Sequence, residues 1–161
     1  MSWRSRPEAW TLALVLAAAL VPRAASAQGW REFQVFGVAL ASDPAVYGGG
    51  LGFSWRDAGR TRITLALAGG TTDDSRGAGR AELTWHFLLD PAKRSGIAVY
   101  GGGGLALGII ENESVTPWIQ AVIGLETSPA SKTSLFIEGG FGGGVRGALG
   151  LRFRSRKARH P

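Results

Sequence analysis

Residues 45–56 read AVYGGGLGFSWR, and large apolar side chains alternate along them with small or polar ones. Tyr47, Leu51, Phe53 and Trp55 share one parity, whereas glycine, serine and Arg56 occupy the other. A period of two is typical of a β-strand, because successive side chains point to opposite faces. The stretch therefore predicts a strand with one large apolar face and one face of small and polar side chains.

The same alternation recurs along the rest of the chain. We predict eight strands, at residues 30–41, 45–56, 61–70, 80–89, 96–109, 117–126, 133–141 and 145–154. The first is irregular, because Phe33 and Val35 lie on one parity and Phe36, Val38 and Leu40 on the other, and a β-bulge would reconcile them. The connections are rich in Gly, Pro, Asp and Ser and too short for parallel crossovers, so neighbouring strands should be antiparallel.

The first 27 residues have the features of a secretory signal peptide. Arg4 and Arg6 give a positive start, residues 10–21 (WTLALVLAAALV) form an apolar stretch, and residues 25–27 (ASA) form a small-residue cleavage site. Twelve apolar residues extend about 18 Å as a helix, well short of the roughly 30 Å hydrocarbon core that an anchoring helix must cross. We therefore predict a signal peptide at 1–27, a barrel domain at 28–154 and a basic tail at 155–161.

Composition disfavours several other classes of protein. The formal net charge of +6 falls to about +4 when Arg4, Arg6, Arg23 and Glu8 leave with the signal peptide, and three of the remaining positive charges lie in 155–161. The rest of the domain is near neutral, which gives no support to a nucleic-acid partner. The chain has no cysteine to form disulfides, and no later segment reaches the roughly 18 consecutive apolar residues of a membrane-spanning helix.

The polar parity decides which face of the sheet lies inside a closed barrel. A soluble barrel hides its large residues, whereas a membrane barrel turns them to lipid and fills its lumen with small and polar side chains. Here the polar parity is mostly Gly and Ala, and Lys occurs only at 93, 132 and 157, in predicted turns or the tail. We therefore predict an all-β, eight-stranded antiparallel up-and-down transmembrane β-barrel. A soluble exported barrel is the alternative.

Two sets of residues follow from this assignment. Polar and charged side chains should form a network in the lumen, in which three glutamates and three arginines balance: Glu32, Arg62, Glu82, His86, Gln120, Glu138, Arg146 and Arg152. Aromatic residues towards the strand ends should form a lipid-facing girdle at the membrane interfaces: Tyr47, Trp55, Trp85, Phe87, Phe141 and Phe153. A register shifted by one residue would turn an arginine to lipid, at a cost of about 2–4 kcal/mol near the midplane.

The last predicted strand contains GALGLRF at residues 147–153, an alternating segment that ends on an aromatic residue. With the pattern of residues 30–154, it resembles the small outer-membrane β-barrel proteins of the OmpA/OmpX type. The resemblance implies recognition of the last strand by the barrel assembly machinery and both termini in the periplasm, with the connections at 72–79 and 110–116 facing outward. The chain departs from the family pattern in that residues 154–161 follow Phe153.

Residues that could suggest catalysis or ligand binding have simpler interpretations. The glycine runs at 101–104 and 139–144 lack the P-loop pattern and are expected to make room in the lumen or a turn. Some eight-stranded barrels are lipid A deacylases with a serine two residues after the histidine, whereas Leu88 follows His86 here. Asp73 and Asp74 are expected to form a solvated turn rather than a cation site. We predict no catalytic, cofactor or metal site.

The sequence thus predicts a monomeric, non-enzymatic barrel in the outer membrane of a Gram-negative-type bacterium, in contact with outer-membrane lipid. Eight strands leave little room for a permeating solute, so the core should be plugged, with a structural or surface-recognition role. The tail at 155–161 would be periplasmic. One alternative is a soluble periplasmic, lipocalin-like barrel that binds an apolar ligand. The other is a lipid A-modifying barrel enzyme.

Overall fold

The computed structural model describes residues 29–56 and 59–156, and these form an all-β structure. The predicted signal peptide and most of the predicted tail lie outside the described residues. In the part of the chain described, no helix is long and apolar enough to cross a membrane. The strands are β1 (Trp30–Ala41), β2 (Val46–Arg56), β3 (Thr61–Thr72), β4 (Gly77–Leu88), β5 (Ile97–Ile110), β6 (Thr116–Thr127), β7 (Thr133–Phe141) and β8 (Val145–Arg156).

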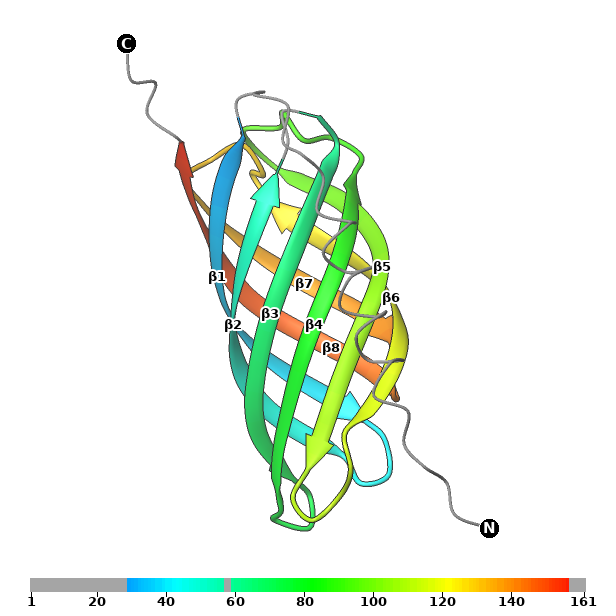
Figure 1. Cartoon of the computed structure of the whole chain (residues 1–161). Helices are drawn as coiled ribbons and strands as arrows, with labels where there is room; N and C mark the ends of the chain where they lie inside the picture. Colours follow the sequence, from blue (N-terminus) through cyan, green and yellow to red (C-terminus); the bar gives the residue numbers. More distant parts are fainter. Residues whose placement is uncertain (1–28, 57–58, 157–161) are drawn as a thin grey trace.

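The eight strands form a closed antiparallel barrel in sequence order, and β1 pairs with β8 to complete it (Figure 1). This confirms the predicted up-and-down barrel. The register advances by ten residues in one circuit, which links Trp30 to Leu40 through Arg56, Arg62, His86, Gly102, Val122, Gly140 and Arg146. Such a stagger accompanies a strand tilt of roughly 35–45° to the barrel axis.

The predicted bulge in the first strand is wrong. The pairing of β1 with β2 runs without a break from Trp30 to Leu40, and its pairing with β8 is equally continuous. Phe33 and Val35 point outward, whereas Phe36 and Leu40 are buried inside the barrel. The parity of β1 is therefore regular, and its irregular pattern arises because this strand adds large apolar side chains to the lumen.

The hairpin between β3 and β4 is tighter than predicted. The strands extend to Thr72 and Gly77, so the connection is 73–76 rather than 72–79. The Thr72 amide donates to the Arg76 carbonyl at 2.9 Å, and the Arg76 amide donates to the Thr72 hydroxyl at the same distance. Ser75 adopts a φ of 67° to close the turn. At the other end of the sequence, β8 continues past the predicted end of the barrel domain to Arg156.

The barrel is apolar outside and polar inside. Large hydrophobic residues face outward from all eight strands, and the exposed ones range from 37% for Val99 to 84% for Ile119. The buried side chains include Arg62 and Arg152, both 0% exposed, with glutamate, glutamine, serine and threonine around them. This is the inversion expected of a membrane barrel and the opposite of a soluble barrel with an apolar lumen.

Lumen glycines let the strands bend closely around this interior. A Cβ atom at Gly102 would meet the carbonyl oxygen of Trp85, and one at Gly104 would meet the carbonyl oxygen of Leu83. Both contacts are with the backbone of β4, which a rotamer change cannot relieve. The glycine run at 101–104 therefore lies within β5, and its two members on the lumen parity, Gly102 and Gly104, allow this strand to approach β4 closely.

Candidate functional site

A cluster of ion pairs fills the half of the lumen near the start of β1 and the end of β8. We call this end of the barrel, where β1 begins and β8 ends, the terminal end, and the opposite end the far end (Figure 1). We call the cluster the terminal ion cluster. It consists of Glu32, Arg56, Arg62, Glu126, Arg152 and Arg154. Strands β1, β2, β3, β6 and β8 contribute these side chains, so the cluster joins most of the barrel wall.

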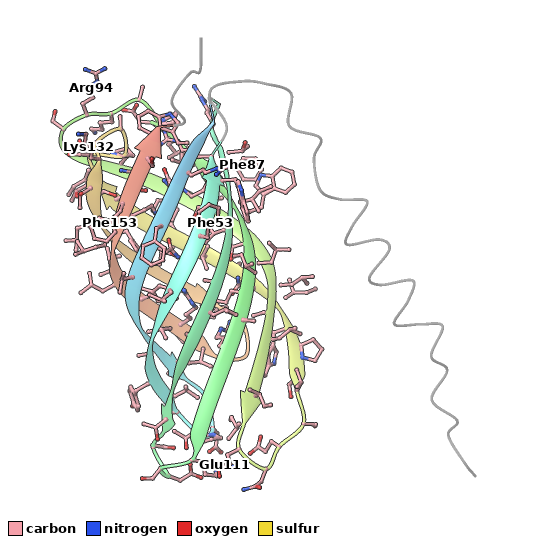
Figure 2. The ribbon with its side chains drawn as sticks, turned by 60° about the vertical axis from the view of Figure 1, so that its left-hand side comes forward. Phe53, Phe87, Arg94, Glu111, Lys132 and Phe153 are labelled. Carbon is pink, nitrogen blue, oxygen red and sulfur yellow. The ribbon has the colours of Figure 1, made fainter. Side chains whose placement is uncertain are left out.

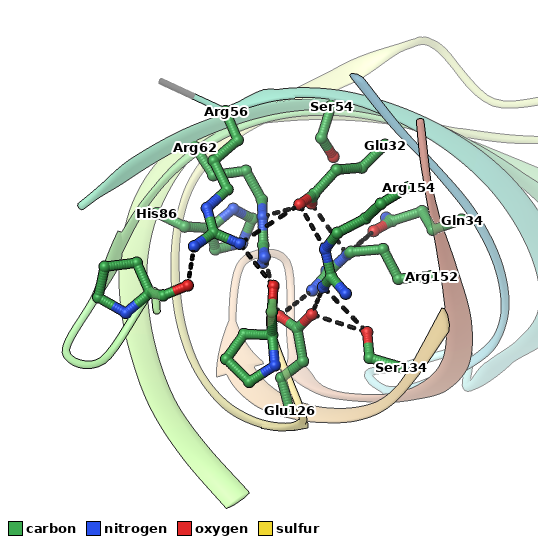
Figure 3. Close-up of polar contacts among 12 residues, drawn as sticks. Glu32, Gln34, Ser54, Arg56, Arg62, His86, Glu126, Ser134, Arg152 and Arg154 are labelled. Atoms are coloured by element: carbon green, nitrogen blue, oxygen red, sulfur yellow. Dashed lines mark hydrogen bonds and ion pairs between the residues drawn. The ribbon is translucent and has the colours of Figure 1, made fainter. Parts of the chain in front are cut away.

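Its two carboxylates lie between the guanidinium groups (Figure 3). Glu32 lies 2.7 Å from Nε of Arg62 through one oxygen and accepts a hydrogen bond of 2.7 Å from Nε of Arg154 through the other. Glu126 Oε2 lies 2.9 Å from Nη2 of Arg62 and 2.6 Å from Nη1 of Arg152, and its other oxygen pairs with Arg154. Each arginine is thus shared between strands that are distant in the sequence.

A second cluster lies further along the lumen, towards the far end. Glu82 accepts from Nε of Arg80 at 2.5 Å and from Nε and Nη2 of Arg146 at 3.0 and 3.1 Å. Arg146 also lies 3.9 Å from Glu138, and Arg80 donates to Gln120 at 3.3 Å. We call these five residues the far ion cluster. Its two glutamates and two arginines balance in charge.

Apolar side chains separate the two clusters. Phe36, Ala66, Phe136 and Ala148 pack together in the lumen, and Ala148 lies on β8 between an arginine of each cluster. The Arg152 guanidinium lies 4.4 Å from the centre of the Phe136 ring, so the apolar layer and the terminal ion cluster are in direct contact. The lumen therefore consists of two charged layers with an apolar layer between them.

The connections 89–96 and 128–132 are tied to the terminal ion cluster at the mouth of the barrel. Arg56 donates to the carbonyl of Pro129 at 2.7 Å and also to that of Pro91. Arg154 donates to the carbonyl of Ser131 at 2.8 Å, and the two connections bond to each other through the Ala130 amide and the Lys93 carbonyl at 3.0 Å. These bonds hold both connections against the terminal end of the lumen.

Towards the far end, side chains of the described strands enclose a small cavity. A cavity of about 20 Å³ lies among Val38, Leu40, Ala68 and Arg80. A cavity of this size holds about one water molecule. It offers no room for a solute of metabolite size.

The structure places all eight residues of the predicted lumen network inside the barrel: Glu32, Arg62, Glu82, His86, Gln120, Glu138, Arg146 and Arg152 are buried. They fall into both clusters, apart from His86. The His86 ring packs edge-on against Tyr100 with centroids 5.3 Å apart, and its Nδ1 lies 3.4 Å from the Thr64 hydroxyl. Because His86 faces the lumen, it does not meet lipid at the outer wall.

The predicted lumen network omits four charged residues that lie in the lumen: Arg56, Arg80, Glu126 and Arg154. All four lie on the lumen parity close to strand ends, and the alternation had already assigned Arg56 to the small and polar face. With them, the charges do not balance as predicted: the described lumen residues include six arginines and four glutamates. The excess of two positive charges lies in the terminal ion cluster.

The six predicted girdle residues all face outward: Tyr47, Trp55, Trp85, Phe87, Phe141 and Phe153 are exposed. Tyr47 and Phe141 lie near the far end, whereas the other four lie nearer the terminal end. Trp85 stacks on Phe87 with ring centres 6.3 Å apart, and Phe53 meets Trp55 edge-on at 4.7 Å. The outward aromatic residues are thus concentrated near the terminal end.

A group of polar residues at the far end ties two hairpins together. Arg76 lies 2.8 Å from Asp74 and 2.5 Å from Glu113, and the Gly77 amide donates to Glu111 at 3.2 Å. A hydrogen bond from the Thr72 hydroxyl and those from Arg76 lower the pKa of Asp74 below its ordinary value. Hydrogen bonds to Glu113 and Asp74 raise the pKa of Arg76. The connections 73–76 and 111–115 therefore form one cross-linked surface.

The described residues contain no group of three His, Cys, Asp or Glu side chains that could hold a metal ion. The acidic pair Asp73 and Asp74 lies at the tip of the β3–β4 hairpin, where both are exposed. Asp74 pairs with Arg76 there, which fits the predicted solvated turn.

Comparisons with known proteins establish the fold. No family model matches the sequence, and no curated protein matches it. The N-terminal β-barrel domain of Pseudomonas aeruginosa OprF is similar with a TM-score of 0.58 at 18% identity, over 80% of this chain and 98% of that one. The chain has the fold of a small outer-membrane barrel. The predicted resemblance to such barrels is confirmed at this level.

Two further solved structures share this barrel fold. The outer membrane protein OprG from Pseudomonas aeruginosa has a TM-score of 0.60 at 8% identity, over 81% of this chain and 97% of that one. Yersinia pestis Ail, studied in a phospholipid bilayer nanodisc, has a TM-score of 0.52 at 12% identity, over 80% of this chain and all (100%) of that one. The barrel fold is therefore shared with little sequence identity.

Proposed function

We propose that this chain is a monomeric, non-enzymatic barrel of the bacterial outer membrane, with a plugged core and a structural or surface-recognition role. The observation that carries the proposal is the outward belt of large apolar side chains on all eight strands around a charged lumen. A soluble monomer rarely exposes an apolar patch above a few hundred Å². A bilayer covers such a belt, and the closed sheet leaves no unpaired strand edge in the lipid.

The route to that membrane follows from the sequence. Residues 1–27 act as a Sec signal peptide, and the barrel assembly machinery inserts the mature chain by its last strand. An even number of strands places the start of β1 and the end of β8 on one side of the membrane, which we assign to the periplasm together with the tail after β8. The far end then faces the outside.

The far end supports recognition or a structural role better than transport. Its connections are short, at 42–45, 73–76, 111–115 and 142–144, and the bonds of Arg76 and Glu111 hold two of them together. The girdle residues, such as Trp55 and Phe87, are suited to the lipid interfaces. The two ion clusters, the apolar layer and the bonded mouth support a plugged core.

The two alternatives fit the structure less well. A lipocalin-like binder needs an apolar lumen, whereas six arginines and four glutamates are found among the described lumen residues. A lipid A-modifying enzyme needs its histidine on the lipid side, whereas His86 is 2% exposed in the lumen. An unchanged mass of extracted lipid A after expression agrees with our proposal, and a mass shift that is lost in His86→Ala contradicts it.

Two experiments test the proposal. Fractionation with heat-modifiable gel mobility asks whether the chain is a membrane barrel: we expect it in the outer-membrane fraction with a mobility shift on boiling, whereas release by osmotic shock contradicts membrane insertion. Planar-bilayer recording then asks whether the core is plugged. We expect no stable openings, because the clusters occupy the lumen, and stable ion-selective openings would contradict a plugged core.

A further inference from the structure

The two ends of the barrel have opposite charge. Of the charged residues outside the lumen that the structure describes, the terminal end has five basic residues and one acidic residue: Arg31, Arg60, Lys93, Arg94, Lys132 and Asp90. The far end has five acidic residues and one basic residue: Asp43, Asp73, Asp74, Glu111, Glu113 and Arg76. The outer surface of the barrel is therefore strongly polarised along its axis.

The basic residues lie directly beyond the aromatic part of the apolar belt. Figure 2 shows Arg94 and Lys132 at one end of the barrel, the aromatic residues Phe53, Phe87 and Phe153 in the half towards that end, and Glu111 at the other end. Side chains at this level lie where an apolar surface meets a polar one, which in a bilayer is the depth of the headgroups.

The strand pairing shows where Arg31 lies relative to the apolar belt. It points outward from β1, is exposed, and pairs across the sheet with Trp55 of β2. Phe33, the next outward residue of β1, is exposed and belongs to the apolar belt. Arg31 is thus on the outward parity, level with the girdle residue Trp55 and one outward position beyond Phe33 towards the terminal end.

We propose that the terminal end binds anionic phospholipid headgroups through a basic rim, made of Arg31, Arg60, Arg94 and Lys132. All four are exposed, and the rim continues the apolar belt, so one lipid molecule contacts both. Lys93 is left out of the rim because its amine donates to the Ile97 carbonyl at 2.8 Å. This inference rests on the proposed membrane insertion.

Because the far end is acidic, we expect anionic lipids to bind at the terminal end and not at the far end. Basic residues are attracted to anionic lipid headgroups, and this attraction falls off within a Debye length of about 8 Å at physiological salt. The two ends lie on opposite sides of the apolar belt, so each senses its own leaflet. We expect the rim to select the anionic lipids of the leaflet at the terminal end, and the acidic far end to contribute nothing to that selection.

Lipid retention tests the proposal. The full chain is expressed, extracted as the folded barrel, reconstituted into nanodiscs of phosphatidylcholine with about one-fifth phosphatidylglycerol, and partly delipidated; the retained lipids are counted by mass spectrometry. We expect at least about threefold enrichment of phosphatidylglycerol over the bulk ratio for the wild type. The variant R31Q/R60Q/R94Q/K132Q should fall to the bulk ratio, as should the wild type in about 1 M NaCl, where the Debye length is about 3 Å.

The far end provides the matched control. The variant D43N/D73N/E111Q/E113Q also changes four charges but leaves the rim intact, and its enrichment should equal that of the wild type. Equal enrichment in the wild type and the rim variant would overturn the proposal, and so would a loss confined to the far-end variant. Heat-modifiable mobility is measured on every sample. Barrels that insert and fold without lipid selection contradict this inference alone, whereas chains that never enter the bilayer contradict the proposed function.

Discussion

Replacement of Glu126 by glutamine tests whether opposite charges hold the lumen together. The Glu126 side chain is 1% exposed, and its carboxylate lies 2.9 Å from Arg62 and 2.6 Å from Arg152. It also accepts a hydrogen bond of 2.7 Å from the Ser134 hydroxyl and pairs with Arg154. Glutamine keeps the volume of the side chain but removes its charge. Three buried guanidinium groups then lose one of the two carboxylates described among them.

The expected loss of stability is large because the arginines stay buried. Removal of one partner from a buried ion pair typically costs about 3–5 kcal/mol, whereas an exposed pair contributes about 0–1 kcal/mol. The terminal ion cluster contains four arginines and two glutamates, so loss of an arginine also relieves repulsion. We therefore expect Glu126→Gln to cost about 3–5 kcal/mol and Arg62→Gln at least about 1 kcal/mol less.

Equilibrium unfolding in urea, with the barrel in lipid vesicles, measures these free energies. The control is Glu113→Gln, which changes a carboxylate that is 48% exposed and 2.5 Å from Arg76, and it should cost less than about 1 kcal/mol. A Glu126→Gln barrel within about 1 kcal/mol of the wild type would refute the reasoning, as would a greater loss in Arg62→Gln. If Glu126→Gln does not fold, the double variant R62Q/E126Q should recover folding, because it restores the excess of two positive charges that the cluster has in the wild type.

Three further predictions concern glycines of the barrel wall, leucines of the apolar belt and Asp74 at the far end. Gly104→Ala should cost about 1–3 kcal/mol in the same assay, because its Cβ meets backbone, whereas Gly147→Ala, with open space around its Cβ among the described residues, should stay within about 0.5 kcal/mol. Leu67 is exposed in the middle of β3, and Leu67→Arg should lower the free energy of unfolding by about 2–4 kcal/mol. Leu89 lies beyond the end of β4, and Leu89→Arg should lower it by less than about 1 kcal/mol. Equal losses of stability would contradict the predicted membrane depth. The pKa of Asp74 is lowered, so its stabilising contribution is complete above the ordinary value of about 3.8 and is lost as the pH falls through the lower folded value. NMR titration of that carboxyl carbon should give a midpoint below about 3.8, and a higher midpoint would contradict the hydrogen bonds to Thr72 and Arg76.

The alternation of residues is enough to predict the strands and their faces. Each residue of a strand points to the face opposite its neighbour, so Leu51, Phe53 and Trp55 were assigned outward from their positions alone, and the structure agrees. Strand one shows the limit of that rule. Phe36 and Leu40 are large and apolar yet face the lumen: Phe36 packs in the layer between the two ion clusters, and Leu40 lines the small cavity towards the far end. Residue size alone cannot distinguish such a layer from a bulge.

The partners within the lumen could not be predicted from alternation. It identifies Arg152 and Glu32 as lumen residues, but which side chains meet depends on the stagger of the whole barrel. Arg152 meets Glu126, which is 26 residues away in the sequence, and Gln34, which is 118 residues away. Strand ends were a second limit, since turn residues such as Gly77 and Gly79 interrupt the pattern while the ladder continues through them.

The belt and the terminal ion cluster determine different aspects of the barrel's closure. A slip of one residue between β1 and β8 would turn Glu32 and Gln34 to lipid, so the apolar belt excludes it. A slip of two residues keeps every side chain on its face, and the belt tolerates it. In the observed register Glu32 lies opposite Arg154 and Gln34 opposite Arg152, and both pairs are hydrogen-bonded, at 2.7 Å and at 2.9 to 3.1 Å. A slip of two would break both pairs, and in one direction it would place Gln34 opposite Gly150, which has no side chain to donate to it. We infer that the apolar belt determines which side chains of β1 and β8 face the lumen, and that the buried charges determine the register between these two strands. Setting a register is the best-attested role of buried polar groups in specifying structure.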